Sequence, residues 1–201
     1  MLTKKDQLEI IAMEILDCKK CNLHKTRKNA VPGEGNPNAK IMFIGEAPGY
    51  WEDVQGRPFV GAAGKFLDTL LANLDFSRGD VFIANILKCR PPRNREPTPK
   101  EIQTCTPYLD RQILAIQPEF IVTLGNHSTA YIFSKASLFL SSITQAHGKT
   151  YEASLLNMRL TIFPTFHPAA ALYSAKYKKE LTNDFQKLKS ELEKRELIKS
   201  S

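Results

Sequence analysis

Four short apolar segments, rich in branched and aromatic residues, recur along the chain. They are residues 41–45 (IMFIG), 81–86 (VFIANI), 120–125 (FIVTLG) and 160–165 (LTIFPT). Continuous apolar runs of this length are typical of strands that are buried on both faces of a sheet. The hydrophobic pattern therefore predicts four buried strands.

Longer segments with apolar residues at helical spacing flank and separate these runs. The predicted helices cover residues 4–17, 62–74, 98–116, 126–135 and 176–198. The start of the helix at 98–116 is the clearest, because Thr98, Pro99 and Glu101 supply an N-cap, a first-turn proline and a capping box. Strands that alternate with helices predict a parallel sheet with helices on both faces. We therefore expect an α/β protein: a three-layer α/β/α fold around a central four-stranded parallel sheet.

The length of 201 residues suits one well-buried domain. We expect a single domain over residues 1–201, with an N-terminal helical extension and a C-terminal helix. No apolar run is as long as the roughly 18 residues of a membrane span, and charged residues interrupt residues 1–17, unlike a signal peptide. We therefore expect an intracellular, cytoplasmic protein with no membrane partner.

The chain has a formal net charge of +7, which favours an anionic partner but does not specify nucleic acid. It also has four cysteines, Cys18, Cys21, Cys89 and Cys105. In a reducing compartment, cysteines are more often free thiols or metal ligands than partners in disulfide bonds. Cys18 and Cys21 form a C-x2-C turn, and four thiolates together suit zinc or an iron–sulfur cluster. Spacing alone favours zinc, the commoner metal, while simple burial in a helix is the alternative for Cys105.

Polar residues follow each predicted strand at its carboxyl end. They are the segment GEAPG (45–49), Asn85, the segment GNH (125–127) and the segment FHP (166–168). These ends of parallel strands face one crevice, where ligands bind, so we expect an active site there. The segment GAAGKF (61–66) lacks the spacing of a P-loop, and no G-x-G-x-x-G or G-x-S-x-G motif follows a strand. Nucleotide binding and serine hydrolysis are therefore disfavoured.

A stiff basic loop lies between Cys89 and Cys105. Arg90, Arg93 and Arg95 stand there among four prolines. Such a loop beside the crevice is suited to binding DNA phosphates, and a solvated basic loop is the equal alternative.

Together these motifs closely resemble those of the family-4 uracil-DNA glycosylases, the iron–sulfur members of the uracil-DNA glycosylase superfamily. The resemblance rests on GEAPG with GRPFVGAAG (56–64), KCRPPRNREPTP (88–99), HPAA (167–170) and the order of the four cysteines, and covers roughly residues 18–184. It implies that Cys18, Cys21, Cys89 and Cys105 hold a [4Fe–4S] cluster, in place of zinc. It also implies catalytic roles for Glu46 and His167, and uracil binding by Gly45, Glu46, Ala47, Phe59, Asn85 and His167.

The implied activity is DNA repair: uracil is flipped out of single- or double-stranded DNA and its N-glycosidic bond is hydrolysed, leaving an abasic site. Phe59 would stack on the base, Asn85 would read its polar edge, His167 would face its O2, and Glu46 would stabilise the cationic sugar or position water. We expect a monofunctional, monomeric prokaryotic enzyme, for which a sliding clamp is a candidate partner.

Three features of the sequence bear on the implied chemistry. The best-known superfamily members carry aspartate and tyrosine where this chain has Ala47 and Gly49, so the means of rejecting thymine and the exact role of Glu46 stay open. Lys65 and Lys88 leave room for a lyase step. A DNA-binding module without catalysis is the competing class, whereas a zinc deaminase would need H-x-E and P-C-x-x-C motifs that this sequence lacks.

Overall fold

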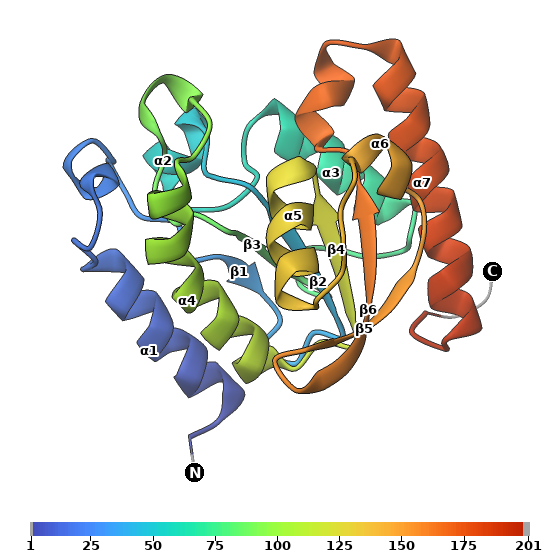
Figure 1. Ribbon diagram of the computed structural model, residues 1–201, viewed down its shortest axis with the longest axis horizontal. Coiled ribbons are helices and arrows are strands. Elements are labelled where there is room, and N and C mark those ends of the chain that lie inside the picture. Colours follow the sequence, from blue (N-terminus) through green and yellow to red (C-terminus); the bar gives the residue numbers. More distant parts are fainter. Residues whose placement is uncertain (1, 199–201) are drawn as a thin grey trace.

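The computed structural model describes residues 2–198 and has a mixed sheet of six strands at its centre (Figure 1). The strands are β1 (Glu34–Gly35), β2 (Ile41–Gly45), β3 (Phe82–Asn85), β4 (Phe120–Leu124), β5 (Tyr151–Leu155) and β6 (Met158–Thr165). Their order across the sheet is β1-β3-β2-β4-β6-β5. The four inner strands are parallel to one another, and they correspond to the four apolar runs of the sequence.

The expectation of a four-stranded, wholly parallel sheet was wrong, because an antiparallel strand is added at each edge. Neither added strand is a continuous apolar run. β1 has only two residues, and β5 alternates between half-buried and exposed positions before the buried Leu155, as a strand with one solvated face does. β5 joins β6 through Leu156 and Asn157, both with positive φ, which is the geometry of a tight hairpin.

Helices cover both faces of the sheet, as predicted for a three-layer fold. They are α1 (Lys4–Leu16), α2 (Tyr50–Gln55), α3 (Ala62–Ala72), α4 (Pro99–Ile116), α5 (Asn126–Lys135), α6 (Ile143–Ala146) and α7 (Ala175–Lys194). Figure 1 shows α1, α4 and α5 on one face and α3 and α7 on the other. The alternation of β2 divides the core accordingly, since Phe43 packs with α3 and α7 while Ile44 packs with α4 and α5.

The N-terminal helix α1 packs along α4, where Glu14 forms an ion pair with Arg111. Ile11 and Ile15 of α1 join Leu87 and Tyr108 in a third apolar cluster, which also includes Cys89 and Cys105. At the other terminus, α7 ends four residues earlier than predicted. The backbone turns at Glu196, whose φ is +57°, and returns Leu197 to the core beside α7.

Within residues 2–198, no helix combines the length and the apolar character needed to cross a membrane.

Candidate active site

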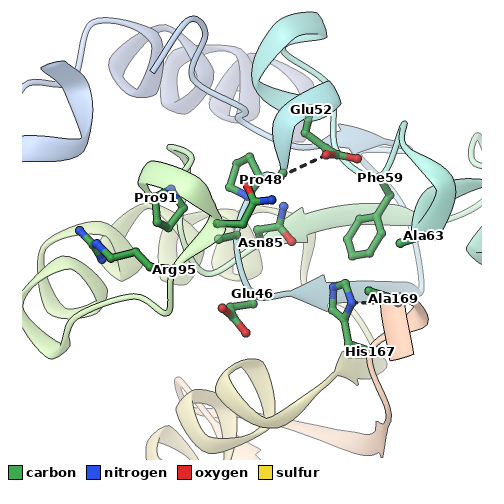
Figure 2. A pocket seen from close by; sticks show the side chains of 13 residues that line it. Glu46, Pro48, Glu52, Phe59, Ala63, Asn85, Pro91, Arg95, His167 and Ala169 are labelled. Atoms are coloured by element: carbon green, nitrogen blue, oxygen red, sulfur yellow. Dashed lines mark hydrogen bonds between the residues drawn. The ribbon is translucent and has the colours of Figure 1, made fainter. Parts of the chain in front are cut away.

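A pocket of about 310 Å³ opens at the carboxyl ends of β2, β3 and β6 (Figure 2). Its walls are formed by Glu46, Ala47, Pro48, Gly49, Glu52, Phe59, Ala63, Asn85, Pro91, Asn94, Arg95, His167 and Ala169. The structure therefore brings five of the six predicted uracil-binding residues into one wall. The sixth, Gly45, lies beneath them, since a Cβ there would overlap Asn85 Oδ1 and lie 2.6 Å from Phe59 Cζ.

Asn85 ends β3 and is paired with Gly45 in the neighbouring strand. Its side chain is 2% exposed, and its Oδ1 has no hydrogen-bond partner within the described chain. A buried acceptor without a donor costs about 1–3 kcal/mol, so such an atom at a pocket wall indicates a ligand that donates a hydrogen bond. The backbone carbonyl of Asn85 accepts from Lys88 Nζ at 2.9 Å, which fixes the end of the strand.

Phe59 stands in the left-handed region, with φ +52°, which is unusual for a residue with a side chain. Two features hold it there. Arg78 donates hydrogen bonds to the carbonyls of Pro58 (2.8 Å) and Phe59, and Gly64 leaves room for the Phe59 carbonyl, which any Cβ at position 64 would overlap. Arg78 and Gly64 thus hold the Phe59 backbone in the left-handed conformation that places its ring at the pocket.

Glu52 ties the two halves of the segment 45–65 together. Its carboxylate accepts from the backbone N–H groups of Val60 (2.8 Å), Gly61 (2.9 Å) and Gly49 (3.1 Å), the last drawn in Figure 2. The loop carrying Phe59 is therefore fastened to the loop that follows β2. The sequence prediction missed both Glu52 and Arg78; the capping position of Glu52, three residues after Gly49, was the available signal.

His167 follows β6 and lies beside Phe59, with 5.6 Å between ring centroids and 28° between ring planes. Figure 2 shows the side chains of Phe59, Asn85 and His167 turned toward one another. His167 Nδ1 accepts from the Ala169 N–H at 3.2 Å, so the proton of the neutral ring is on Nε2. Desolvation lowers the pKa of His167 to about 4, and Nε2 is therefore a neutral donor at physiological pH.

Glu46 directly follows β2 at the pocket wall. The pKa of its carboxyl is raised above the usual value for glutamate, mainly because burial removes the carboxylate from water. The charge of His127 opposes this rise, and the negative charge of Glu96 adds to it. His127 Nε2 lies 3.9 Å from Glu46 Oε2 and 4.0 Å from Glu96 Oε1. His127 belongs to a strand-end segment recognised in the sequence, but it was not among the predicted site residues.

The four cysteines line one cavity on the other side of the loop that follows β3, together with Ile15, His24, Lys88, Thr104 and Tyr108. All four are free thiols. Two of the sulfur atoms accept hydrogen bonds: Cys89 Sγ from Arg27 Nη1 at 3.0 Å, and Cys105 Sγ from the Lys88 backbone N–H at 3.2 Å. Over residues 2–198, no three His, Cys, Asp or Glu side chains converge as they would on a single ion.

The three arginines of the basic loop differ in their surroundings. Arg95 lines the pocket, but its guanidinium is paired with both carboxylate oxygens of Glu101, at 2.7 and 2.9 Å, and this pairing lowers the pKa of Glu101 to about 2. Arg90 Nε donates to Asn94 at 2.7 Å. Arg93 is exposed and forms no ion pair with any other residue of the described chain.

The family model described as "Uracil DNA glycosylase superfamily" matches residues 32–190. The chain belongs to this superfamily, and within it to the type-4 uracil-DNA glycosylases. It is 54% identical over 188 residues to the type-4 uracil-DNA glycosylase of Saccharolobus solfataricus, a match that covers 93% of this chain and 87% of the relative. The type-4 uracil-DNA glycosylase of Archaeoglobus fulgidus is 47% identical, with 91% and 92% covered. That of Thermotoga maritima is 40% identical, with 96% and 99% covered.

The superfamily match contains Glu46, Phe59, Asn85 and His167, and thus the four side chains around the pocket to which roles were assigned. It contains Cys89 and Cys105 but begins after Cys18 and Cys21. The longer matches to the type-4 enzymes agree with the family resemblance recognised in the sequence.

Proposed function

We propose that the pocket receives a uracil base flipped out of DNA, and that this chain hydrolyses the bond between that base and its sugar. The observation that carries the proposal is the buried Oδ1 of Asn85, which lies at the pocket wall without a donor. Uracil supplies the missing donor, its N3–H, and offers O4 to the amide N–H of the same side chain. Cytosine presents an acceptor at N3 and a donor at N4, so it mismatches both groups in the same amide orientation.

Phe59 supplies the flat face for the base. Base–aromatic stacking contributes about 1–3 kcal/mol per base and tolerates any base, so Phe59 provides affinity while Asn85 provides selectivity. Gly45 allows the two side chains to approach each other, because any larger residue would occupy the space between them.

Breakage of the N-glycosidic bond leaves positive charge on the sugar and negative charge on the departing base. The neutral Nε2–H of His167 is a donor for the developing charge on uracil O2, and the ionised carboxylate of Glu46 stabilises the cationic sugar or orients the attacking water. Water adds to C1′, the base leaves as an anion that is later protonated, and an abasic site remains. Among residues 2–198, no lysine lines the pocket, which supports a monofunctional enzyme.

We also propose that Cys18, Cys21, Cys89 and Cys105 hold a [4Fe–4S] cluster. All four thiols line one cavity, and cysteine thiolates in sets of four are the ligands that hold [4Fe–4S] clusters. N–H donors to two of the sulfurs are a further feature of iron–sulfur sites. These cysteines would hold it from the segment after α1 (Cys18 and Cys21), the loop after β3 (Cys89) and α4 (Cys105), so its role would be structural; the pocket residues carry out the reaction.

DNA reaches the pocket past the basic loop, where Arg90 and Arg93 are the better placed phosphate contacts and Arg95 is held by Glu101. Both single-stranded and double-stranded DNA are proposed substrates. We propose that the enzyme acts as a monomer, since a single chain builds the whole pocket.

The test is incubation of the purified holoenzyme with an oligonucleotide that contains one uracil, followed by alkaline cleavage at abasic sites. Release of uracil by the wild type, lost in Asn85→Ala, is the expected result. A protein that binds the oligonucleotide tightly and shows the broad visible absorption of an intact cluster, but releases no uracil, would instead be a DNA-binding module.

A further inference from the structure

The first turn of α2 presents two large aromatic side chains to solvent at the rim of the pocket. Tyr50 is 46% exposed and Trp51 is 54% exposed, and their rings meet edge to face with centroids 5.1 Å apart. Gly49 before them and Glu52 after them both line the pocket. Exposed neighbouring aromatics beside a binding pocket indicate a contact surface, and none of the roles assigned so far uses them.

Two cations lie over the ring of Tyr50. Lys28 Nζ is 5.6 Å and the guanidinium carbon of Arg90 is 5.2 Å from the ring centroid, both within the range of cation–π attraction. Arg90 comes from the basic loop and directly precedes Pro91, another residue of the pocket wall. The aromatic pair therefore lies in a positively charged environment.

The two acidic residues of the same helix turn face inward. Glu52 is occupied by the backbone N–H groups that fasten the Phe59 loop. Asp53 is 2% exposed and accepts from the Lys28 N–H at 2.8 Å. The solvent-facing side of this helical turn is therefore aromatic and cationic. The two carboxylates, which would repel DNA, face inward and accept hydrogen bonds from backbone N–H groups.

We propose that the face of Trp51 is a platform on which an unpaired base next to the uracil stacks. Tyr50, at an interplanar angle of 82°, supports the Trp51 ring, while Lys28 and Arg90 over the Tyr50 ring attract the adjoining phosphates. The inference rests on the proposed function, because it takes the neighbouring pocket to hold the uracil. The occupant is single-stranded DNA, since aromatic faces combined with cations are what proteins use to hold unpaired bases. A paired base stays within its duplex and offers no free face to the platform.

Trp51 is the chain's single tryptophan, so tryptophan emission of the holoenzyme reports on this platform alone. The probe is a single-stranded oligonucleotide with a tetrahydrofuran abasic analogue at the uracil position, which cannot be hydrolysed. We expect its binding to quench the emission. A second oligonucleotide, in which the bases on both sides of the analogue are also removed, should bind through its phosphates with much less quenching. Equal quenching by both would overturn the platform.

Variants provide the second measurement. Trp51→Ala should raise the concentration of single-stranded DNA needed for half-maximal excision by roughly fivefold to 150-fold, the range that base–aromatic stacking contributes, and should affect duplex DNA less. Trp51→Phe should restore most of this loss. Phe139→Ala is the matched control, because Phe139 is 87% exposed but lies on a loop away from the pocket wall.

If Trp51→Ala instead lowers the saturating single-turnover rate and leaves the half-maximal concentration unchanged, Trp51 acts by holding the pocket and the platform is overturned. Because the quenching experiment uses DNA that cannot react, base-dependent quenching supports the platform even in a preparation that excises no uracil. That second result contradicts only the proposed function.

Discussion

The backbone carbonyl of Phe59 occupies the space that a side chain at Gly64 would need. The first helical turn of α3 and the loop bearing the stacking ring are thus packed backbone against backbone. This contact explains why position 64 is a glycine, although glycine inside a helix otherwise costs stability.

Gly64→Ala should therefore displace Phe59 and lower uracil excision at least tenfold, with a loss of stability of about 1–3 kcal/mol from overpacking. Single-turnover excision and thermal unfolding check both effects. Gly79→Ala is the control, because a Cβ at Gly79 meets nothing closer than Ser77 Oγ at 3.5 Å. Equal behaviour of the two variants would show that the ring does not depend on this contact.

Asn85→Asp should lower uracil excision by orders of magnitude and raise cytosine excision relative to it. The substitution removes the donor for O4, and the carboxyl group accepts from cytosine N4–H and, when protonated, donates to N3. Single-turnover rates on matched uracil and cytosine oligonucleotides measure the ratio. If the ratio stays constant, Asn85 only caps its strand and another group reads the base.

In a pH–rate profile, the excision rate should fall at low pH, on the acid limb, as Glu46 becomes protonated. Burial raises the pKa of Glu46, so this limb should lie at higher pH than for an ordinary glutamate. His127→Ala should move the limb to still higher pH, because the charge of His127 lowers the Glu46 pKa. His167 has a pKa of about 4 and is therefore mainly neutral above that pH. A pH–rate profile that does not move in His127→Ala would contradict the coupling.

The lowered pKa of His167 also predicts how the free energy of unfolding changes with pH. Its pKa is lower in the folded protein than its usual value near 6.5, so folding favours the neutral ring. This contribution should be fully present above that usual value and be lost as the pH falls toward about 4. His167→Asn should flatten the stability curve over this interval in urea titrations at several pH values; an unchanged curve would contradict the assignment.

Arg93→Gln should reduce the slope of log affinity against log salt by about one, since each phosphate contact releases about one counterion. Arg159→Gln is the matched control, because Arg159 is also exposed but lies near the start of β6, at the end of the sheet away from the pocket. Slopes that do not differ between the two variants would mean that the basic loop is only a solvated surface.

Cys89→Ala should lower thermal stability and DNA affinity together, because the cluster would hold the basic loop to α1 and α4. Visible absorption reports the cluster, thermal unfolding the stability, and binding of the abasic-analogue oligonucleotide the affinity. A folded, cluster-free variant with unchanged DNA affinity would contradict this role.

The sequence predicted the elements whose position follows from the burial of apolar residues. The four inner strands are apolar on both faces, and their polar ends identified Glu46, Asn85 and His167 as neighbours in space. The family resemblance supplied Phe59, whose position depends on a left-handed backbone that no periodicity reveals. Arg78 escaped prediction because it acts on backbone groups about 20 residues away in the sequence, and such a hydrogen bond leaves no local pattern. Glu52 had a local signal in its capping position after Gly49, but its bonds to Val60 and Gly61 had none. The edge strands were missed because they are short or half exposed.

The two-residue strand β1 also has a consequence for how copies of the protein meet one another. It covers the side of β3, an apolar strand that would otherwise offer an unpaired row of backbone groups to another molecule. Because β1 is so short and is followed by a turn, it is a poor template for a further strand. Deleting β1 should expose this edge of β3 and promote intermolecular sheet growth on heating, which light scattering would measure.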